Sequence, residues 1–127
     1  SLAAAPGEEW IYAVALRRET AGAKPFGVTR LFLNPALRGI EKALRNSGGR
    51  PVYALIERDF KVRIDRVEQM ITAVTLAEED AANLGVPAGT PGLCIRRSYF
   101  DGDGRLVEMA DTVHPADRFT YRMELQR

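Results

Sequence analysis

The sequence has very little cysteine and histidine. Cys94 is the only cysteine and His114 the only histidine among 127 residues. One cysteine cannot form an internal disulfide, and neither a cysteine cluster nor a second histidine is available for a zinc site. We therefore expect no metal and no cofactor. A single cysteine also fits a protein of the reducing cytoplasm.

The chain has no excess charge of either sign and no long apolar run. Its 18 Lys and Arg residues nearly balance 17 Asp and Glu residues, for a formal net charge of +1. The basic residues are scattered along the chain, so it lacks the positive surface typical of proteins that grip DNA or anionic membranes. No apolar run approaches the ~20 residues of a membrane helix. We expect no membrane association, and no DNA binding by this chain alone.

Motifs of common enzymes are also missing. The sequence has no G-x-S-x-G elbow, no P-loop and no catalytic carboxylate pair at helical spacing. What remains is an ordinary globular composition, 46% hydrophobic and 28% charged, in a length that suits one compact domain. The opening SLAAAPG is too short and too uncharged for a signal peptide, and it lacks an initiator Met. We expect residues 1–9 to be a linker remnant or an artificial chain boundary, and residues 10–127 to be the domain.

The hydrophobic pattern predicts strands and helices in the order ββ-αα-β-α-βββ. Strands are expected at residues 10–18, 26–33, 62–74, 93–100, 105–114 and 119–125, the last of them half-buried. Asn34-Pro35 begins a helix that Gly48-Gly49 ends, and a short second helix begins near Pro51. A capping box of Thr75 and Glu78 begins a third helix, which runs through Leu84. This order predicts an α+β domain with a mainly antiparallel sheet.

The hairpin near the C-terminus carries one residue of each charge among apolar neighbours. If residues 101–104 form a loop of two or four residues, Arg97 lies opposite Glu108 on the same face of the sheet. The pair could be an ordinary cross-strand ion pair, which contributes little when exposed. It could also be a polar anchor inside a pocket, because buried charges are tolerated mainly when they are paired or hold a ligand. Spacing alone leaves both interpretations open.

Arginines recur on several predicted strands. Arg17, Arg30 and the pair Arg96-Arg97 are so placed, and guanidinium groups are suited to bidentate recognition of carboxylate or phosphate. The alternative is that these side chains only solubilise outer faces. Similarly, a lone histidine such as His114 is more often structural than functional, and Cys94 is expected to pack as a small apolar residue.

From about residue 10 to residue 127 the chain resembles a UTRA domain, the effector-sensing half of bacterial GntR-type regulators of the HutC group. The C-terminal half carries the more specific part of this resemblance. Its matching positions are Gln69, Ala73, Ala81, the run LGVPAGTPGL, Arg97, Asp101, Gly104, Glu108, Asp117, Arg118 and Tyr121.

The resemblance implies a chorismate lyase-like fold, with an antiparallel sheet and flanking helices around an enclosed ligand pocket. It also implies a homodimer that binds a small metabolite, while a separate N-terminal winged-helix domain, which this sequence does not contain, binds DNA. The full-length protein would be a transcription factor, with repression relieved by the effector.

Individual positions match the family unevenly. By resemblance, Arg17 matches an arginine that holds an anionic group in sugar-phosphate-sensing members, and Glu108 matches a glutamate that contacts ligand hydroxyl or amino groups. A second arginine, a glutamate and a tyrosine of that pattern are replaced here by Glu19, Thr29 and His114. These departures favour another small polar metabolite, such as a carboxylate or an amino-acid derivative.

We therefore predict a cytoplasmic effector-binding domain rather than an enzyme. The predicted ligand-binding residues are Arg17, Arg30, Tyr53, Arg97, Glu108 and His114. Two alternatives stay open. A chorismate lyase-like enzyme acting on an aromatic carboxylate would use the same residue types, and a ligand-free dimerisation module would have a pocket too small or too apolar for a metabolite.

Overall fold

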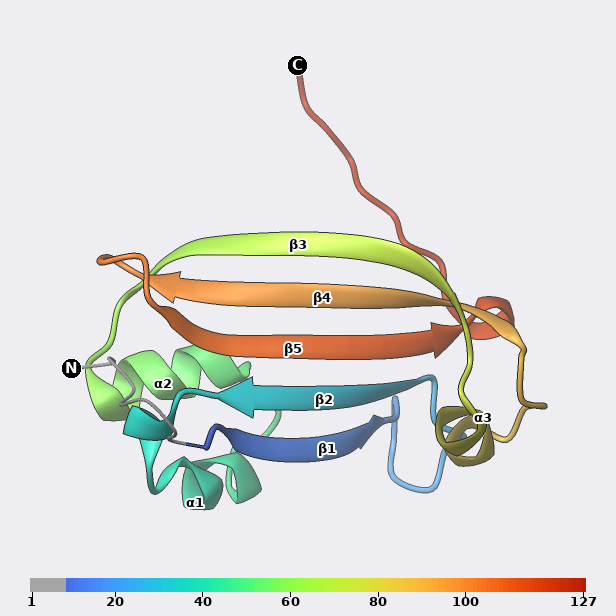
Figure 1. Ribbon diagram of the computed structural model, residues 1–127, viewed down its shortest axis with the longest axis horizontal. Helices are drawn as coiled ribbons and strands as arrows, with labels where there is room; N and C mark the ends of the chain where they lie inside the picture. Colours follow the sequence, from blue (N-terminus) through green and yellow to red (C-terminus); the bar gives the residue numbers. More distant parts are fainter. Residues whose placement is uncertain (1–8) are drawn as a thin grey trace.

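The chain folds around a five-stranded antiparallel sheet with the strand order β1-β2-β5-β4-β3 (Figure 1). The computed structural model describes residues 9–127, so nearly all of the predicted linker lies outside the described residues. The strands are β1 (Ile11–Arg17), β2 (Gly27–Leu33), β3 (Ile64–Thr75), β4 (Pro91–Asp101) and β5 (Leu106–Pro115). The predicted α+β class with an antiparallel, chorismate lyase-like sheet is confirmed.

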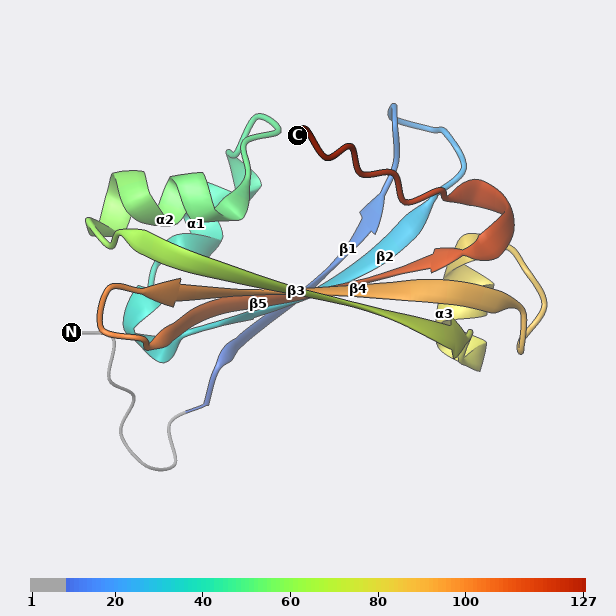
Figure 2. The ribbon, with the colours of Figure 1, turned by 90° about the horizontal axis from the view of Figure 1, so that it is seen from above.

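Short helices cover opposite ends of the sheet (Figure 2). They are η1 (Pro35–Leu37), α1 (Ile40–Arg45), α2 (Val52–Phe60), α3 (Glu78–Leu84) and η2 (Ala116–Arg118). One core cluster joins η1, α1 and α2 to the sheet through Leu33, Leu37 and Ile56. A second cluster joins α3 to the opposite face through Val28 and Leu84. No helix within residues 9–127 is both long and apolar enough to cross a membrane.

The helix starts agree only in part with the sequence signals. Asn34 is an N-cap as predicted, because its Oδ1 accepts a hydrogen bond from the backbone N–H of Ala36 at 2.9 Å. The helix then breaks into η1 and α1, because Gly39 takes the left-handed conformation with φ at 91°. The predicted capping box is wrong. Thr75 is the last residue of β3, and Ala77 is the N-cap of α3, without a side-chain cap hydrogen bond.

The β4–β5 hairpin has a different register from the predicted one. Asp101 pairs across a three-residue turn with Arg105, which shifts the strands by one residue. A bulge near Val107 then shifts them by one more, so that Tyr99 lies opposite Glu108, and Arg97 opposite Ala110. Either shift alone would move every side chain of β5 to the opposite face of the sheet. The two shifts together return the β5 side chains to the predicted face, so Arg97 and Glu108 are diagonal neighbours on one face instead of direct partners.

The predicted last strand does not form. Residues 119–127 have no strand assignment, and Tyr121, Met123 and Leu125 are exposed. Their alternation with polar residues is real, but the segment has no strand partner in the described part of the chain. A pattern of period two predicts an extended backbone; it cannot supply the neighbouring strand that would bury one side of it.

Candidate functional site

The larger of two hollows within residues 9–127 lies on the face of the sheet that α1 and α2 partly cover. Its cavity volume is about 830 Å³, which is within the range of small-molecule sites. Residues 13–17 of β1, odd-numbered residues of β2 and β4 and even-numbered residues of β5 form its floor. The segment from Leu44 to Tyr53 forms one rim, and Phe26 and Phe119 contribute to the lining as well.

Five of the six predicted site residues line this pocket: Arg17, Tyr53, Arg97, Glu108 and His114. Arg30 does not. It lies between Thr29 and Leu31, which face the pocket, so the alternation of β2 directs it to the other face. There its guanidinium makes a two-pronged ion pair with Asp80 of α3, at 2.7 and 3.2 Å. Arg30 is therefore left out of the candidate site.

Glu108 has the most unusual environment in the pocket. It is 3% exposed, and its Oε1 has no hydrogen-bond partner within the described residues. Desolvation by burial raises the pKa of Glu108 to about 7. The ion pair with Arg97 that spacing left open is not formed; Arg97 instead donates its Nε to Oε1 of Gln69 at 2.7 Å. A buried carboxyl without a partner is costly, and such groups are concentrated at functional sites.

Arginines dominate the charge of the pocket. Besides the predicted Arg17 and Arg97, the lining includes Arg45 and Arg50 from the α1–α2 region. No sequence pattern singles out these two: Arg45 is the last residue of α1 and Arg50 lies in the Gly-rich loop after it, so whether either faces the sheet depends on how this region folds over it. Four guanidinium groups and one carboxyl make the pocket suited to a ligand with an anionic group.

His114 is held in one orientation by its neighbours. Its ring stacks on Phe119 at 3.8 Å and lies parallel to Phe26 at 5.9 Å. Its Nδ1 donates to the carbonyl oxygen of Phe26 at 2.9 Å, because a carbonyl can only accept. Burial lowers the pKa of His114, against the hydrogen bond to Phe26, which raises it. The neutral ring therefore keeps Nε2 as an acceptor at the pocket wall.

Uncharged groups complete the pocket. Thr29 and Thr112 share a hydrogen bond between their hydroxyl groups at 2.8 Å, so one hydroxyl keeps a proton that it can donate to a ligand. Tyr53 and Tyr99 stack with their ring centroids 5.7 Å apart and form an aromatic wall. The sequence marked Thr29 only as a departure from the family pattern; its pairing with Thr112 depends on the β2–β5 register.

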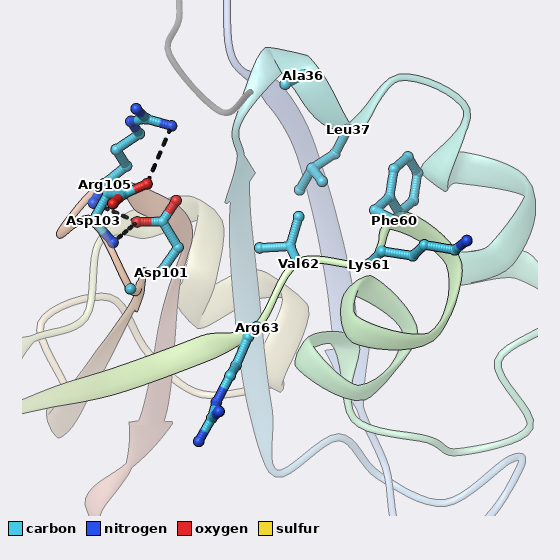
Figure 3. Close-up of a pocket in the computed structure, with 10 residues that line it drawn as sticks. Ala36, Leu37, Phe60, Lys61, Val62, Arg63, Asp101, Asp103 and Arg105 are labelled. Carbon is cyan, nitrogen blue, oxygen red and sulfur yellow. Dashed lines mark hydrogen bonds and ion pairs between the residues drawn. The ribbon is translucent and has the colours of Figure 1, made fainter.

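A second, smaller hollow of about 360 Å³ lies beyond the edge of this site, and none of the six predicted residues lines it. Leu37, Phe60 and Val62 form its apolar side, and the β4–β5 turn forms its polar side (Figure 3). The carboxylate of Asp101 is already engaged there, since its Oδ1 accepts from the backbone N–H groups of Asp103 and Arg105. The second carboxylate of the lining, Asp103, lies 3.8 Å from the Arg105 guanidinium, so both carboxylates are engaged within the turn and this hollow is the weaker candidate.

No group of three or more His, Cys, Asp or Glu side chains within residues 9–127 is arranged to hold a metal ion. The candidate site thus offers guanidinium, carboxyl, imidazole, hydroxyl and aromatic groups around one cavity. Such a set can bind a small polar molecule by charge and hydrogen bonds.

Comparison with known proteins gives a consistent result. The family model described as "UTRA domain" matches residues 2–120. The chain is 28% identical over 113 residues to the HTH-type transcriptional regulator Rv0792c of Mycobacterium tuberculosis, covering 87% of this chain and 42% of that protein. It is 33% identical over 70 residues to the HTH-type transcriptional repressor NagR of Bacillus subtilis, covering 55% and 29%. The chain thus spans less than half of the curated relatives it matches.

Solved structures agree with the sequence relatives. The fold matches the ligand-binding domain of a protein described as a GntR-family transcriptional regulator from Bordetella bronchiseptica, with a TM-score of 0.70 and 28% identity. That match covers 83% of this chain and 65% of the other.

Proposed function

The chain belongs to the UTRA domain family found in GntR-type transcriptional regulators, and from this premise we propose that its sheet-face pocket binds a small polar metabolite that controls a repressor. The observation that carries the proposal is the buried Glu108, whose Oε1 has no hydrogen-bond partner within the described residues, in a cavity lined by four arginines. Burial of an isolated carboxyl lowers stability, and a ligand that supplies a hydrogen-bond donor to it would recover part of that cost.

The ligand we propose has two kinds of polar group. An anionic group, carboxylate being the simplest, would lie near Arg97 and Arg17, and a hydroxyl or amino group would donate to Glu108. His114 would accept a hydrogen bond through Nε2. The departures from the sugar-phosphate pattern, including Thr29 in place of a glutamate, support a carboxylate or amino-acid derivative over a phosphosugar.

The remaining features of the regulator are part of the same proposal. We assign DNA binding to a separate winged-helix domain, because both curated relatives are named as HTH-type proteins and are much longer than this chain. The working form would be a HutC-type homodimer in the cytoplasm. Effector binding would favour one of two dimer arrangements and so change the spacing of the DNA-binding domains.

A binding experiment with matched arginine variants tests the pocket. A thermal-shift screen of amino acids, hydroxy acids and sugar phosphates should find a ligand, since one present at ~100 times its dissociation constant adds ~2.7 kcal/mol of apparent stability. Arg97→Ala should then weaken that ligand by about 10- to 100-fold, the loss expected for a charge-assisted hydrogen bond. Titration calorimetry measures the change.

Arg96→Ala is the control. Arg96 is the chain neighbour of Arg97 but lies on the other face, where it pairs with Asp111, so ligand affinity should not change. Equal affinity in the Arg97 variant and the wild type would show that the pocket is assigned wrongly. Release of pyruvate from chorismate by this chain would favour the enzyme alternative. The pocket volume and its arginines already argue against a ligand-free dimerisation module.

A further inference from the structure

The C-terminal segment, defined here as residues 120–127, leaves the body of the domain without a strand partner. After η2 it passes the β3 side of the sheet and extends beyond it (Figure 1). Tyr121, Met123 and Leu125 are 37%, 63% and 78% exposed, so exposure of these apolar side chains increases along the segment. Scattered exposed apolar residues are normal on a protein surface. Here, however, three apolar side chains alternate with polar ones along an unpaired segment. They form one apolar side of the segment, which is exposed to water in the isolated chain.

The edge strand β3 is left open in the same region. It is the longest strand, with 12 residues, and it hydrogen bonds to β4 on one side while its other side ends the sheet. Val67, Met70 and Ile71 on this strand are 52%, 51% and 40% exposed. A long edge strand with exposed apolar side chains is the kind of edge that proteins normally protect or pair with another chain.

The segment cannot easily cover its own β3 strand. Phe119 stacks on His114 of β5, and two residues later the Tyr121 hydroxyl accepts a hydrogen bond from Nε2 of Gln69 in the middle of β3 at 3.0 Å. The segment therefore begins beside His114 and sends the Tyr121 side chain toward β3, and the chain then continues past the β3 edge (Figure 1). Residues 122–127 then lie past the edge of their own sheet.

We propose that residues 120–127 of one chain pack against the β3 strand of a second copy, and that the second copy does the same in return. Each chain carries both the segment and the β3 edge that receives it. A two-fold axis between two copies therefore forms both contacts at once and closes the assembly as a dimer. Met123 and Leu125 would cover Val67 and Ile71 of the partner.

The charges of the two surfaces are compatible with this contact. The segment carries Arg122, Glu124 and Arg127, a net charge of +1, and β3 carries Asp65, Arg66 and Glu68, a net charge of −1, all of them exposed. Opposite charges at the rim favour association and orient it. The interface gives the proposed dimer a defined surface, and in that respect it rests on the proposed function.

The residue that precedes the C-terminal segment is part of the ligand pocket. Phe119 lines the pocket and stacks on His114. A chain of two hydrogen bonds also joins Arg97 to Gln69 and Gln69 to Tyr121. A ligand that engages Arg97 or His114 therefore acts on residues that fix where the segment leaves the domain. The interface between copies is thus directly connected to the pocket.

Sedimentation of the intact chain and of a chain ending at Thr120 tests the interface. The intact chain should be a dimer, and the shortened chain should associate more weakly by about 100-fold or more, because the apolar side of the segment is lost. The melting temperature of the shortened monomer should match that of a Met123→Asp, Leu125→Asp variant, since both leave the core intact. A dimer that persists unchanged after truncation, or an intact chain that is monomeric at its solubility limit, would overturn the proposal.

Disulfide trapping identifies the acceptor surface. In a Cys94→Ser background, a Met123→Cys chain mixed with an Ile71→Cys chain should form a mixed disulfide, which can only be intermolecular. Mixing with Val14→Cys is the control, because Val14 is 50% exposed on the opposite edge strand. Trapping that favours position 14 would refute β3 as the acceptor. Neither experiment uses a metabolite, so a negative result would count against the interface and not against the proposed ligand pocket. A failed metabolite screen would count against the pocket and not against the interface.

Discussion

Replacing Glu108 by glutamine is expected to remove a large part of the pH dependence of folding stability. The ordinary pKa of 4.5 applies in the unfolded chain, and burial raises the pKa of Glu108 in the folded chain to about 7. Between these values the folded chain binds more protons than the unfolded chain, so the free energy of unfolding falls as pH rises. The wild type should lose about 3 kcal/mol from this group, at about 1.36 kcal/mol per pKa unit.

The glutamine variant cannot ionise at this position, so it escapes that loss. Relative to wild type, Glu108→Gln should become more stable by about 2.5 kcal/mol when the buffer changes from about pH 5 to about pH 8. Urea unfolding at both pH values measures the four free energies. The comparison cancels the contribution of His114, whose lowered pKa affects both proteins alike.

Glu79→Gln is the matched control for the charge change itself. Glu79 is exposed in the first turn of α3, and its replacement should give a pH profile parallel to that of the wild type. If the Glu108→Gln profile is also parallel to wild type, then Glu108 is hydrated or paired in solution, and the argument for a ligand at this carboxyl fails with it.

The sequence predicted the faces of the sheet better than its register. Strand alternation placed Arg97 and Glu108 on one face, and the structure agrees, although the turn has three residues and a bulge follows it. The prediction succeeded because the two one-residue shifts cancel in parity. The local sequence does not predict the bulge, because valine is an ordinary strand residue. Val107 is buried in the core cluster formed with η1, α1 and α2, which is a tertiary contact.

Residues whose role depends on distant partners were the ones that the sequence could not place. The sequence around Arg30 does not distinguish it from the other strand arginines. Its role depends on Asp80, which α3 places on the face of the sheet opposite the pocket. Arg45 and Arg50 reach the pocket only because the α1–α2 region folds over the sheet. Propensity and spacing describe one segment at a time, whereas these placements depend on tertiary packing.

The resemblance to the UTRA family identified Glu108 as a ligand-binding residue, which the local sequence pattern could not do. Spacing alone could not distinguish an ion pair from a ligand anchor. The structure shows that Arg97 turns to Gln69 and leaves the Glu108 carboxyl without that partner. This arrangement gives a physical reason to regard Glu108 as a site residue, independent of any family comparison.

Adding one methyl group at Gly92 is expected to destabilise the whole C-terminal half of the domain. A Cβ on this buried β4 residue would overlap the backbone carbonyl oxygen of His114 and lie 3.1 Å from Leu76. A flexible side chain could move aside, but the carbonyl belongs to β5, next to the ladder position that Gly92 shares with Pro115. We expect Gly92→Ala to cost about 3 kcal/mol, the upper end of the usual overpacking range.

The same overlap links this glycine to the site. Moving the backbone of His114 would disturb the stack on Phe119 and the hydrogen bond to Phe26, so the variant should bind the effector more weakly even where it is fully folded. Gly102→Ala in the exposed turn is the control, because no atom lies within 4 Å of a Cβ there; its stability should stay within about 0.5 kcal/mol of wild type. Urea unfolding of both variants decides the matter: equal stability would mean that β4 and β5 separate locally at little cost, and that His114 is held less firmly than its contacts imply.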